Sequence, residues 1–388
     1  MRLILIFSLL LSAITASSIP ARGQLQNDVL ANKALQNLAK HTIWDEGSTE
    51  KCSIRNAAKR REWHTLSKTE KRTFVDAILC LSEKPSRTPL EDYPGVRNRY
   101  DDFVAIHMNQ TSFIHQTANF LSWHRYFIWV YEKALREECG YKGYLPYYNY
   151  AKYASDPLQS PLFDGSDTSI SGNGAYVNHT GLDIPNASVP HIHIPPGPGG
   201  GCITTGPFVN WTANLGPVVN ALPYVEKNPD PAGLGRYYNP RCLRRDISAF
   251  VSAGWAKDQD IVDLISDYTD ILSFQSRLQG DSKAGYLGVL SAGHWMVGGD
   301  PGGDFYTSPG DPWFFLHHAM IDRIWWTWQN LEVEERTFQV GGTITFLNNP
   351  PSRNGTLDDV LDLGIDGEAI MMGEAMSSVG GPFCYIYV

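Results

Sequence analysis

The sequence lacks the features that would direct it to a nucleic acid or a membrane surface. It has no lysine- or arginine-rich run, and its 41 acidic residues outnumber its 32 basic ones, giving a formal net charge of -9 at pH 7. That balance provides no attraction for phosphate backbones or anionic lipid. Beyond the N-terminus, no apolar run approaches the ~20 residues that span a bilayer. We expect neither nucleic acid nor membrane as a partner, and no protein partner is evident.

Internal repeats, low-complexity blocks and sharp breaks in composition are also absent. Because no linker can be placed, residues 19–388 are expected to form a single domain. Hydrophobic residues make up 43% of the 388-residue chain, which is enough to bury a large core.

The first 18 residues have the layout of a cleavable signal peptide, with one arginine, an apolar run and then small residues. A membrane anchor is the alternative, but the run is short for a span. Secretion would place six cysteines, an even number, in an oxidising compartment where all could pair. It would also allow glycosylation at several of five Asn-X-Ser/Thr sites.

Apolar spacing predicts a mainly helical fold. Residues 67–83, 118–138, 244–279 and 316–330 show the three- and four-residue steps of helices. Residues 154–243 are dense in Gly, Pro, Asn and Ser, which favours long surface loops. β-Branched and aromatic residues within 337–346 and 383–388 suit short strands. The expected architecture is a helical core wrapped by long loops, with a few short strands.

Five of the 11 histidines stand at spacings that suit metal binding: His107, His115, His124, His294 and His318. Neutral imidazole is the commonest protein ligand for copper and zinc, and three imidazoles on rigid elements leave positions open for a substrate. Spacing alone is weak evidence, so the surrounding residues matter. FLSWHRYFIWVYEKAL surrounds His124, and SPGDPWFFLHHAMIDRIWWTWQ surrounds His318.

These two segments resemble the metal-binding signatures of the tyrosinase, catechol oxidase and hemocyanin family. GCITTGPF, GTLDDVLDLG and GGPFCYIYV also resemble segments of its short secreted fungal members. The resemblance implies a type-3-copper-like helical bundle core. It implies that His317 is a hydrogen-bonded neighbour, that Asp322 orients a ligand, and that Arg323 holds Asp322. It assigns two metal sites, the first at His107, His115 and His124 and the second at His294 and His318.

Two positions depart from the family pattern. The family's second site begins with two histidines four residues apart on one helical face, and Leu290 stands where the first is expected, four residues before His294. Phe113 stands where fungal tyrosinases and catechol oxidases commonly carry a cysteine that cross-links to a histidine. Because leucine cannot donate to a metal, a stable pair of copper ions is not expected unless another side chain replaces it.

Other polar residues could supply the missing ligand. His191, His193, Asp300 and Asp304 lie in loops that could fold over the site, although solvated loop residues are the simpler interpretation of the two histidines. Asn109 is expected to pack near the site without a glycan. Surface or structural roles are expected for His41, His64 and His179. Core packing, rather than a wall for an aromatic substrate, is expected for Trp313, Trp325, Trp326 and Trp328.

Three functions remain open. The surviving residues fit a redox-inert ion such as zinc, which can polarise a carbonyl without a second metal. One group on this fold, fungal cyclopenase, is associated with zinc and converts cyclopenin-type benzodiazepinediones to viridicatin-type quinolones. The resemblance therefore implies, as first expectation, a zinc-dependent lyase of alkaloid biosynthesis that acts on a small aromatic amide. A copper-dependent phenol or catechol oxidase of the tyrosinase type is the second expectation, and a non-catalytic pseudoenzyme is the third.

Overall fold

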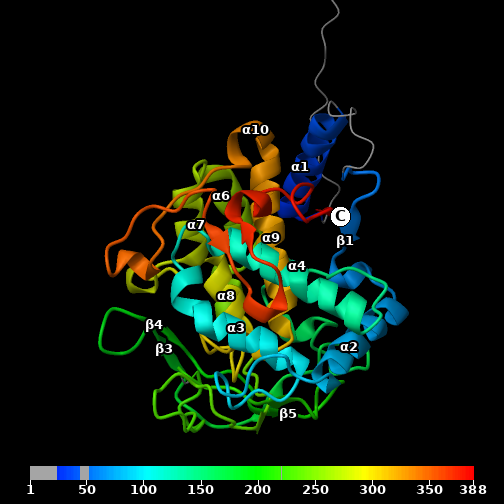
Figure 1. The fold of residues 1–388 in the computed structure, drawn as a ribbon. Coiled ribbons are helices and arrows are strands. Elements are labelled where there is room, and N and C mark those ends of the chain that lie inside the picture. Colours follow the sequence, from blue (N-terminus) through cyan, green and yellow to red (C-terminus); the bar gives the residue numbers. More distant parts are fainter. Residues whose placement is uncertain (1–23, 44–51, 220) are drawn as a thin grey trace, which may run out of the picture.

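The computed structural model describes residues 24–43, 52–219 and 221–388, so the expected signal peptide lies outside the described residues. Helices α3, α4, α8 and α9 occupy the centre, and most strands lie at the periphery (Figure 1). The helices are α1 (Gln26–Ile43), α2 (Lys68–Glu83), α3 (Arg99–Ile114), α4 (Phe120–Glu138), α5 (Ala249–Trp255), α6 (Asp258–Asp267), α7 (Ile271–Gln279), α8 (Gly288–Val297), α9 (Trp313–Leu331) and α10 (Val333–Arg336). Among the described residues, none of the helices has the length and apolar character to cross a membrane.

The strands form two-stranded ladders. The pairs are β1 (Ala58–Arg60) with β10 (Tyr385–Tyr387), β2 (Gly174–Tyr176) with β5 (Gly200–Ile203), β3 (Leu182–Ile184) with β4 (Ile192–Ile194), β6 (Thr212–Ala213) with β7 (Arg241–Cys242), and β8 (Val360–Leu361) with β9 (Ile370–Met371). The β1–β10 pair is parallel and joins the segment after α1 to the C-terminal strand, in the register Lys59 opposite Ile386. The prediction of a mainly helical protein with a few short strands is confirmed.

Helix α9 lies at the core and packs on α1, α4, α6 and α8. Asp311 caps its start, since its Oδ1 accepts a hydrogen bond from the Trp313 N–H at 2.9 Å. Every residue from Trp313 to Asn330 is buried, as expected of a helix surrounded by protein on all faces. The expectation of core packing is confirmed for the four tryptophans, each at most 1% exposed: Trp313, Trp325, Trp326 and Trp328.

The other predicted helices are found close to their expected bounds. Residues 67–83 form α2, whose N-terminus carries a reciprocal capping box between Ser67 and Glu70. Residues 118–138 form α4, and residues 244–279 are divided into α5, α6 and α7. Helix α3 begins at Asn98, whose side chain accepts from the Asp101 N–H at 3.0 Å. Asp101 and Asp102 lie in its first turn, where their negative charges interact favourably with the positive end of the helix dipole.

In its described residues, the predicted loop region 154–243 contains short strands and a 3-10 turn at Pro157–Gln159 between long irregular stretches. Strand β10 confirms the prediction for residues 383–388, but the prediction of a strand within 337–346 is wrong. That segment instead lies against α7, where the Gly341 carbonyl accepts from the Gln275 side chain and the Gln339 side chain accepts from the Ile271 N–H. Asn109 is exposed, contrary to the expected packing. The other asparagines of the Asn-X-Ser/Thr sites are exposed too: Asn178, Asn186, Asn210 and Asn354.

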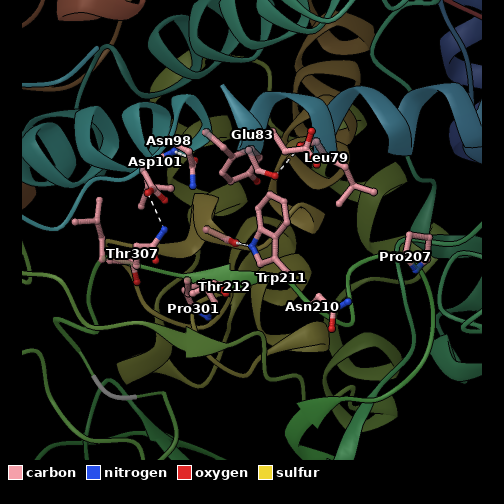
Figure 2. Close-up of a pocket in the computed structure, with 17 residues that line it drawn as sticks. Leu79, Glu83, Asn98, Asp101, Pro207, Asn210, Trp211, Thr212, Pro301 and Thr307 are labelled. Atoms are coloured by element: carbon pink, nitrogen blue, oxygen red, sulfur yellow. Dashed lines mark hydrogen bonds between the residues drawn. The ribbon is translucent and has the colours of Figure 1, made fainter. Parts of the chain in front are cut away.

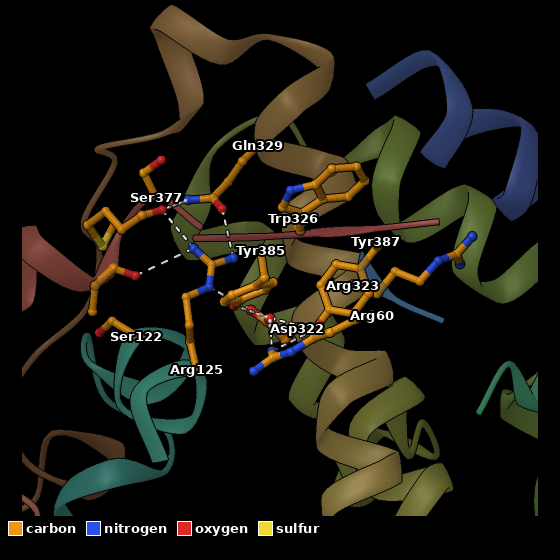
Figure 3. A network of polar contacts seen from close by, with 12 residues as sticks. Arg60, Ser122, Arg125, Asp322, Arg323, Trp326, Gln329, Ser377, Tyr385 and Tyr387 are labelled. Atoms are coloured by element: carbon orange, nitrogen blue, oxygen red, sulfur yellow. Dashed lines mark hydrogen bonds and ion pairs between the residues drawn. The ribbon is translucent and has the colours of Figure 1, made fainter. Parts of the chain in front are cut away.

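A buried carboxylate joins the C-terminal strand to the helical core (Figure 3). Asp322 in α9 accepts hydrogen bonds from Tyr385 and Tyr387 at 2.6 Å each, from Arg125 at 2.6 Å and from Arg60 at 3.4 Å. The expectation that Asp322 orients a metal ligand is therefore wrong, because its oxygens are taken by arginines and tyrosines.

The expected pairing of Arg323 with Asp322 is also wrong. Arg323 points to the start of α1, where its guanidinium donates to Asn27 at 2.9 Å and to Asp28 at 2.7 Å. Adjacent residues of a helix project about 100° apart, so an acidic residue and the arginine next to it reach different neighbours.

All six cysteines form disulfides, as an even count in an oxidising compartment allows. The pairs are Cys52–Cys384, Cys80–Cys139 and Cys202–Cys242.

Candidate metal centre

Three histidines from two adjacent helices converge in the core. His107 lies in the middle of α3, His115 directly follows the end of α3, and His124 lies near the start of α4. One nitrogen of each lies within 4.8 Å of the corresponding nitrogens of the other two. All three side chains are at most 5% exposed. The structure therefore brings together the three residues predicted for the first site.

Backbone carbonyls fix the orientation of these three rings. A carbonyl can only accept, so each Nδ1 must carry the proton and each Nε2 is left with a free lone pair. The Nε2 atoms of His107 and His124 are buried without a hydrogen-bond partner, which is the arrangement that a metal ion would satisfy. The Nδ1 contacts are His107 to the Tyr306 carbonyl at 2.8 Å, His115 to Thr111 at 2.9 Å and His124 to Phe120 at 2.8 Å.

A second group forms between α8 and α9. His294 in α8 and His318 in α9 face each other, with 3.2 Å between their Nε2 atoms. Two nitrogens bound at ~2.0 Å to one tetrahedral ion would lie about 3.3 Å apart, so the pair is spaced for a shared ion. His317 joins them, because a nitrogen of each of the three residues lies within 4.8 Å of the others.

The surroundings of His317 neither confirm nor exclude its expected role as a hydrogen-bonded neighbour. Within the described residues, neither of its ring nitrogens forms a hydrogen bond of ordinary geometry, but the Leu290 carbonyl acts on the ring as a backbone acceptor, so that role stays a prediction. Its ring stacks on Trp313 at 5.7 Å between centroids and meets the His294 ring edge-on at 4.5 Å. Burial lowers the pKa of His317 to about 3, an effect that the Leu290 carbonyl offsets only in part.

Leu290 lies one turn before His294 in α8 and is 5% exposed, and none of the four residues considered as replacement ligands belongs to either histidine group. Their partners are elsewhere. His191 and His193 lie against Asp183, Asp300 pairs with Arg241, and Asp304 accepts from the main chain at Val218, Val219 and Tyr306. The remaining histidines lie against carboxylates, with His41 near Glu334, His64 on Glu62 and His179 on Asp246.

The two histidine groups are adjacent. The rings of His124 and His318 stack with 4.5 Å between centroids and 12° between planes. Burial lowers the pKa of every ring in the two groups, and the neighbouring imidazoles lower it further for most of them. For His115 the value falls to about 4. All the rings are therefore neutral near pH 7, the form that binds metal ions.

Aromatic side chains border the first group on its accessible side. Phe305 is 39% exposed, and its ring lies 4.6 Å from the His115 ring and 6.0 Å from Phe346. Phe113 is 58% exposed, and no cysteine of the described residues is free to cross-link to a histidine, since all six are in disulfides. The arrangement suits the stacking of a flat apolar ring beside His115.

A separate pocket of about 330 Å³ lies at the other end of α3 (Figure 2). Asp101 and Trp211 line it together with Asn98 and Thr307, and none of the candidate metal-binding histidines does. Burial raises the pKa of Asp101 to about 6, although its carboxylate accepts from Asn214 and from the Arg97 N–H at 2.8 Å each. The Asp101 carboxylate already has partners, and none of the histidine groups borders this pocket, so we assign it no part in the chemistry.

Known proteins similar to this chain share most of its length. Residues 97–331 match the family described as the common central domain of tyrosinase. Tyrosinase P from Aspergillus terreus is 39% identical over 333 residues, covering 84% of this chain and 91% of that protein. The N-acetyl-6-hydroxytryptophan oxidase ivoB from Emericella nidulans is 38% identical over 353 residues, covering 87% of this chain and 94% of that protein.

A solved structure extends the likeness to the fold. A polyphenol oxidase from Thermothelomyces thermophila superposes with a TM-score of 0.89 at 40% sequence identity, covering 94% of this chain and 98% of that one. Residues 97–331, which match the tyrosinase central domain, contain all six histidines of the two groups. On the central-domain match, the relatives and the shared fold, the chain belongs to the tyrosinase family.

Proposed function

We propose that this chain is a two-metal oxidoreductase that oxidises a hydroxylated aromatic metabolite with dioxygen. The observation that carries the proposal is the adjacency of two groups of three imidazoles, which meet at the stacked rings of His124 and His318. Copper is the ion that suits this chemistry, since imidazole is a preferred ligand of copper and copper can change its redox state. The oxidase names of the relatives from Aspergillus terreus and Emericella nidulans support the same reaction class.

The residues of the first group would hold one ion through Nε2 of His107, His115 and His124. Their protonated Nδ1 atoms are locked on carbonyls, so the lone pairs are already directed inward before any ion arrives. When bound, a pair of copper ions would supply the redox chemistry with dioxygen. The side chains around the imidazoles exclude water, because Phe127 and Phe314 pack against the same rings at no more than 1% exposure.

The substrate would lie against Phe305, whose partly exposed ring forms the aromatic edge beside His115. No carboxylate of the described residues belongs to either histidine group, so the groups offer no negative charge that would favour a cationic substrate. For a catechol the reaction balances as two catechols and one dioxygen giving two quinones and two waters. Each catechol loses two electrons and two protons, and dioxygen accepts all four of each.

A non-oxidative function is the second candidate, because Leu290 leaves the second group without the family's usual first histidine. In that case zinc in the first group would polarise a carbonyl of a small aromatic amide, as in the cyclopenase-type conversion of cyclopenin to a quinolone. That reaction needs one ion and no oxidant.

The two candidates can be separated with purified protein loaded with either copper or zinc. Oxygen uptake is measured with catechol and with a hydroxylated tryptophan derivative under air, and conversion of cyclopenin is followed by mass spectrometry without oxygen. We expect oxygen uptake by the copper-loaded protein alone. His107→Ala should abolish it, whereas His41→Ala, at an exposed position, should not.

Quinolone formation without oxygen, dependent on zinc and abolished by a chelator, would establish the lyase instead. Turnover in neither assay, with both metals bound, would contradict both candidates.

A further inference from the structure

We propose that His317 is the third ligand of the second metal ion, in the role that Leu290 cannot take. The inference rests on the proposed two-metal site and concerns how this chain builds its second half. The juxtaposition that carries it is the clustering of His294, His317 and His318 at the contact of α8 with α9.

The first argument comes from the unpartnered nitrogens. His317 is fully buried, and within the described residues neither Nδ1 nor Nε2 has a hydrogen-bond partner of ordinary geometry. The Leu290 carbonyl lies near the ring and can accept from at most one of the two nitrogens. At least one is therefore left unpaired, at a cost of about 1–3 kcal/mol. A metal ion between His317 and its neighbours would satisfy that nitrogen.

The second argument is distance. The ligand atoms of the three histidines lie within 4.8 Å of one another, and the Nε2 atoms of His294 and His318 are 3.2 Å apart. Two nitrogens on one tetrahedral ion at ~2.0 Å lie about 3.3 Å apart, so the coordinating nitrogen of His317 needs a shift of at most about 1.5 Å. Its ring also contacts the His294 ring edge-on, with 4.5 Å between centroids.

The third argument is the close packing of the His317 ring between α8 and α9. A Cβ at position 293 would lie 2.1 Å from Cε1 of His317, so glycine there is what admits the imidazole against α8. Trp313 stacks on the His317 ring at 15° between planes and donates its indole N–H to the Gly293 carbonyl at 3.0 Å. The ring is thus held between a glycine and a tryptophan beside His294.

The test counts metal ions in the copper-reconstituted full chain by elemental analysis. The native protein should bind about two copper ions, and His317→Phe, which keeps the ring but removes its nitrogens, should bind about one. Adding the family's usual ligand in the double variant Leu290→His/His317→Phe should restore two. His41→Phe, at an exposed position, should leave the count at two.

A native protein that binds one copper ion and gains a second on Leu290→His would overturn the inference, as would two ions retained in His317→Phe. If His317→Phe does not fold, Leu290→His in the native background still decides, because the inference expects it to leave the count unchanged. Oxygen uptake with two ions in His317→Phe would refute the ligand assignment and leave the oxidase intact. If binding of the second ion depends on His317 but no hydroxylated aromatic supports oxygen uptake, the ligand assignment would stand and the oxidase function would be refuted.

Discussion

At the scale of single residues, the contact between Gly293 and His317 decides the shape of the second histidine group. His317 is enclosed by Trp313, His294 and the α8 backbone, so its ring cannot move away without opening a gap in the core. Close packing makes such positions sensitive to one added carbon.

Gly293→Ala is therefore expected to displace the His317 ring and to weaken the second site. The number of bound metal ions should fall from about two to about one per chain. The measurement is elemental analysis, with circular dichroism to confirm the fold. Gly254→Ala is the matched control, because it lies in helix α5 with no atom within 4 Å of an added Cβ. That control should keep both ions and change the free energy of unfolding by no more than about 1 kcal/mol. If Gly293→Ala retains two ions, the His317 ring can accommodate the added methyl group, and the expected steric conflict does not occur.

Single residues also show what the sequence could predict. The five metal-binding candidates could be predicted because they stand in distinctive local segments that resemble the family signatures. The roles of Asp322 and His317 could not be predicted. Asp322 is bound by Arg60 and Tyr385, which are 262 and 63 residues away in the chain. The place of His317 depends on a glycine in another helix, so no local pattern reveals it.

At the scale of elements, the C-terminal strand β10 holds the helical core together although it is only three residues long. It pairs with β1, and its two tyrosines reach Asp322 in α9, which also binds Arg125 in α4. The short strand was predictable from its aromatic alternation, whereas its attachment was not, because that attachment joins four segments far apart in the sequence (Figure 3).

Asp322→Asn is expected to reduce the free energy of unfolding by about 3–5 kcal/mol, because it leaves the buried Arg125 guanidinium without its counter-charge, whereas Arg60 keeps Glu132. Denaturant titration measures the loss. Asp167→Asn removes an exposed carboxylate that pairs with Arg72, and should cost no more than about 1 kcal/mol. A loss for Asp322→Asn as small as that of the control would mean that the network contributes little to stability.

At the scale of the whole molecule, disulfides close loops of very different length. Cys52–Cys384 spans 332 residues and joins the segment before β1 to the C-terminal strand, while Cys80–Cys139 spans 59 and links α2 to the end of α4. Because a crosslink restricts the unfolded chain more when its loop is longer, the first pair should contribute more to stability.

Replacing both cysteines of a pair by serine tests this difference. The Cys52/Cys384 variant is expected to lose about 1.5 kcal/mol more unfolding free energy than the Cys80/Cys139 variant, from the ratio of loop lengths. Denaturant titration under identical conditions gives both values. An equal or larger loss for the shorter loop would show that contacts in the folded state outweigh chain entropy here.

The buried imidazoles should also make the stability of the metal-free protein depend on pH. Burial lowers the pKa of His115 to about 4, whereas an unfolded histidine titrates near 6.5. As the pH falls below about 6.5 the unfolded chain takes up a proton that the folded chain does not, so the free energy of unfolding falls until about pH 4, where the folded ring is protonated too. His115 alone should account for about 3 kcal/mol across this window.

Denaturant titration of chelator-treated protein between pH 7.5 and 4.5 measures how the free energy of unfolding changes with pH. His115→Gln should flatten that dependence, and His41→Gln, at an exposed position, should not. The same slope in the native protein and in His115→Gln would mean that this ring is not held neutral by its burial.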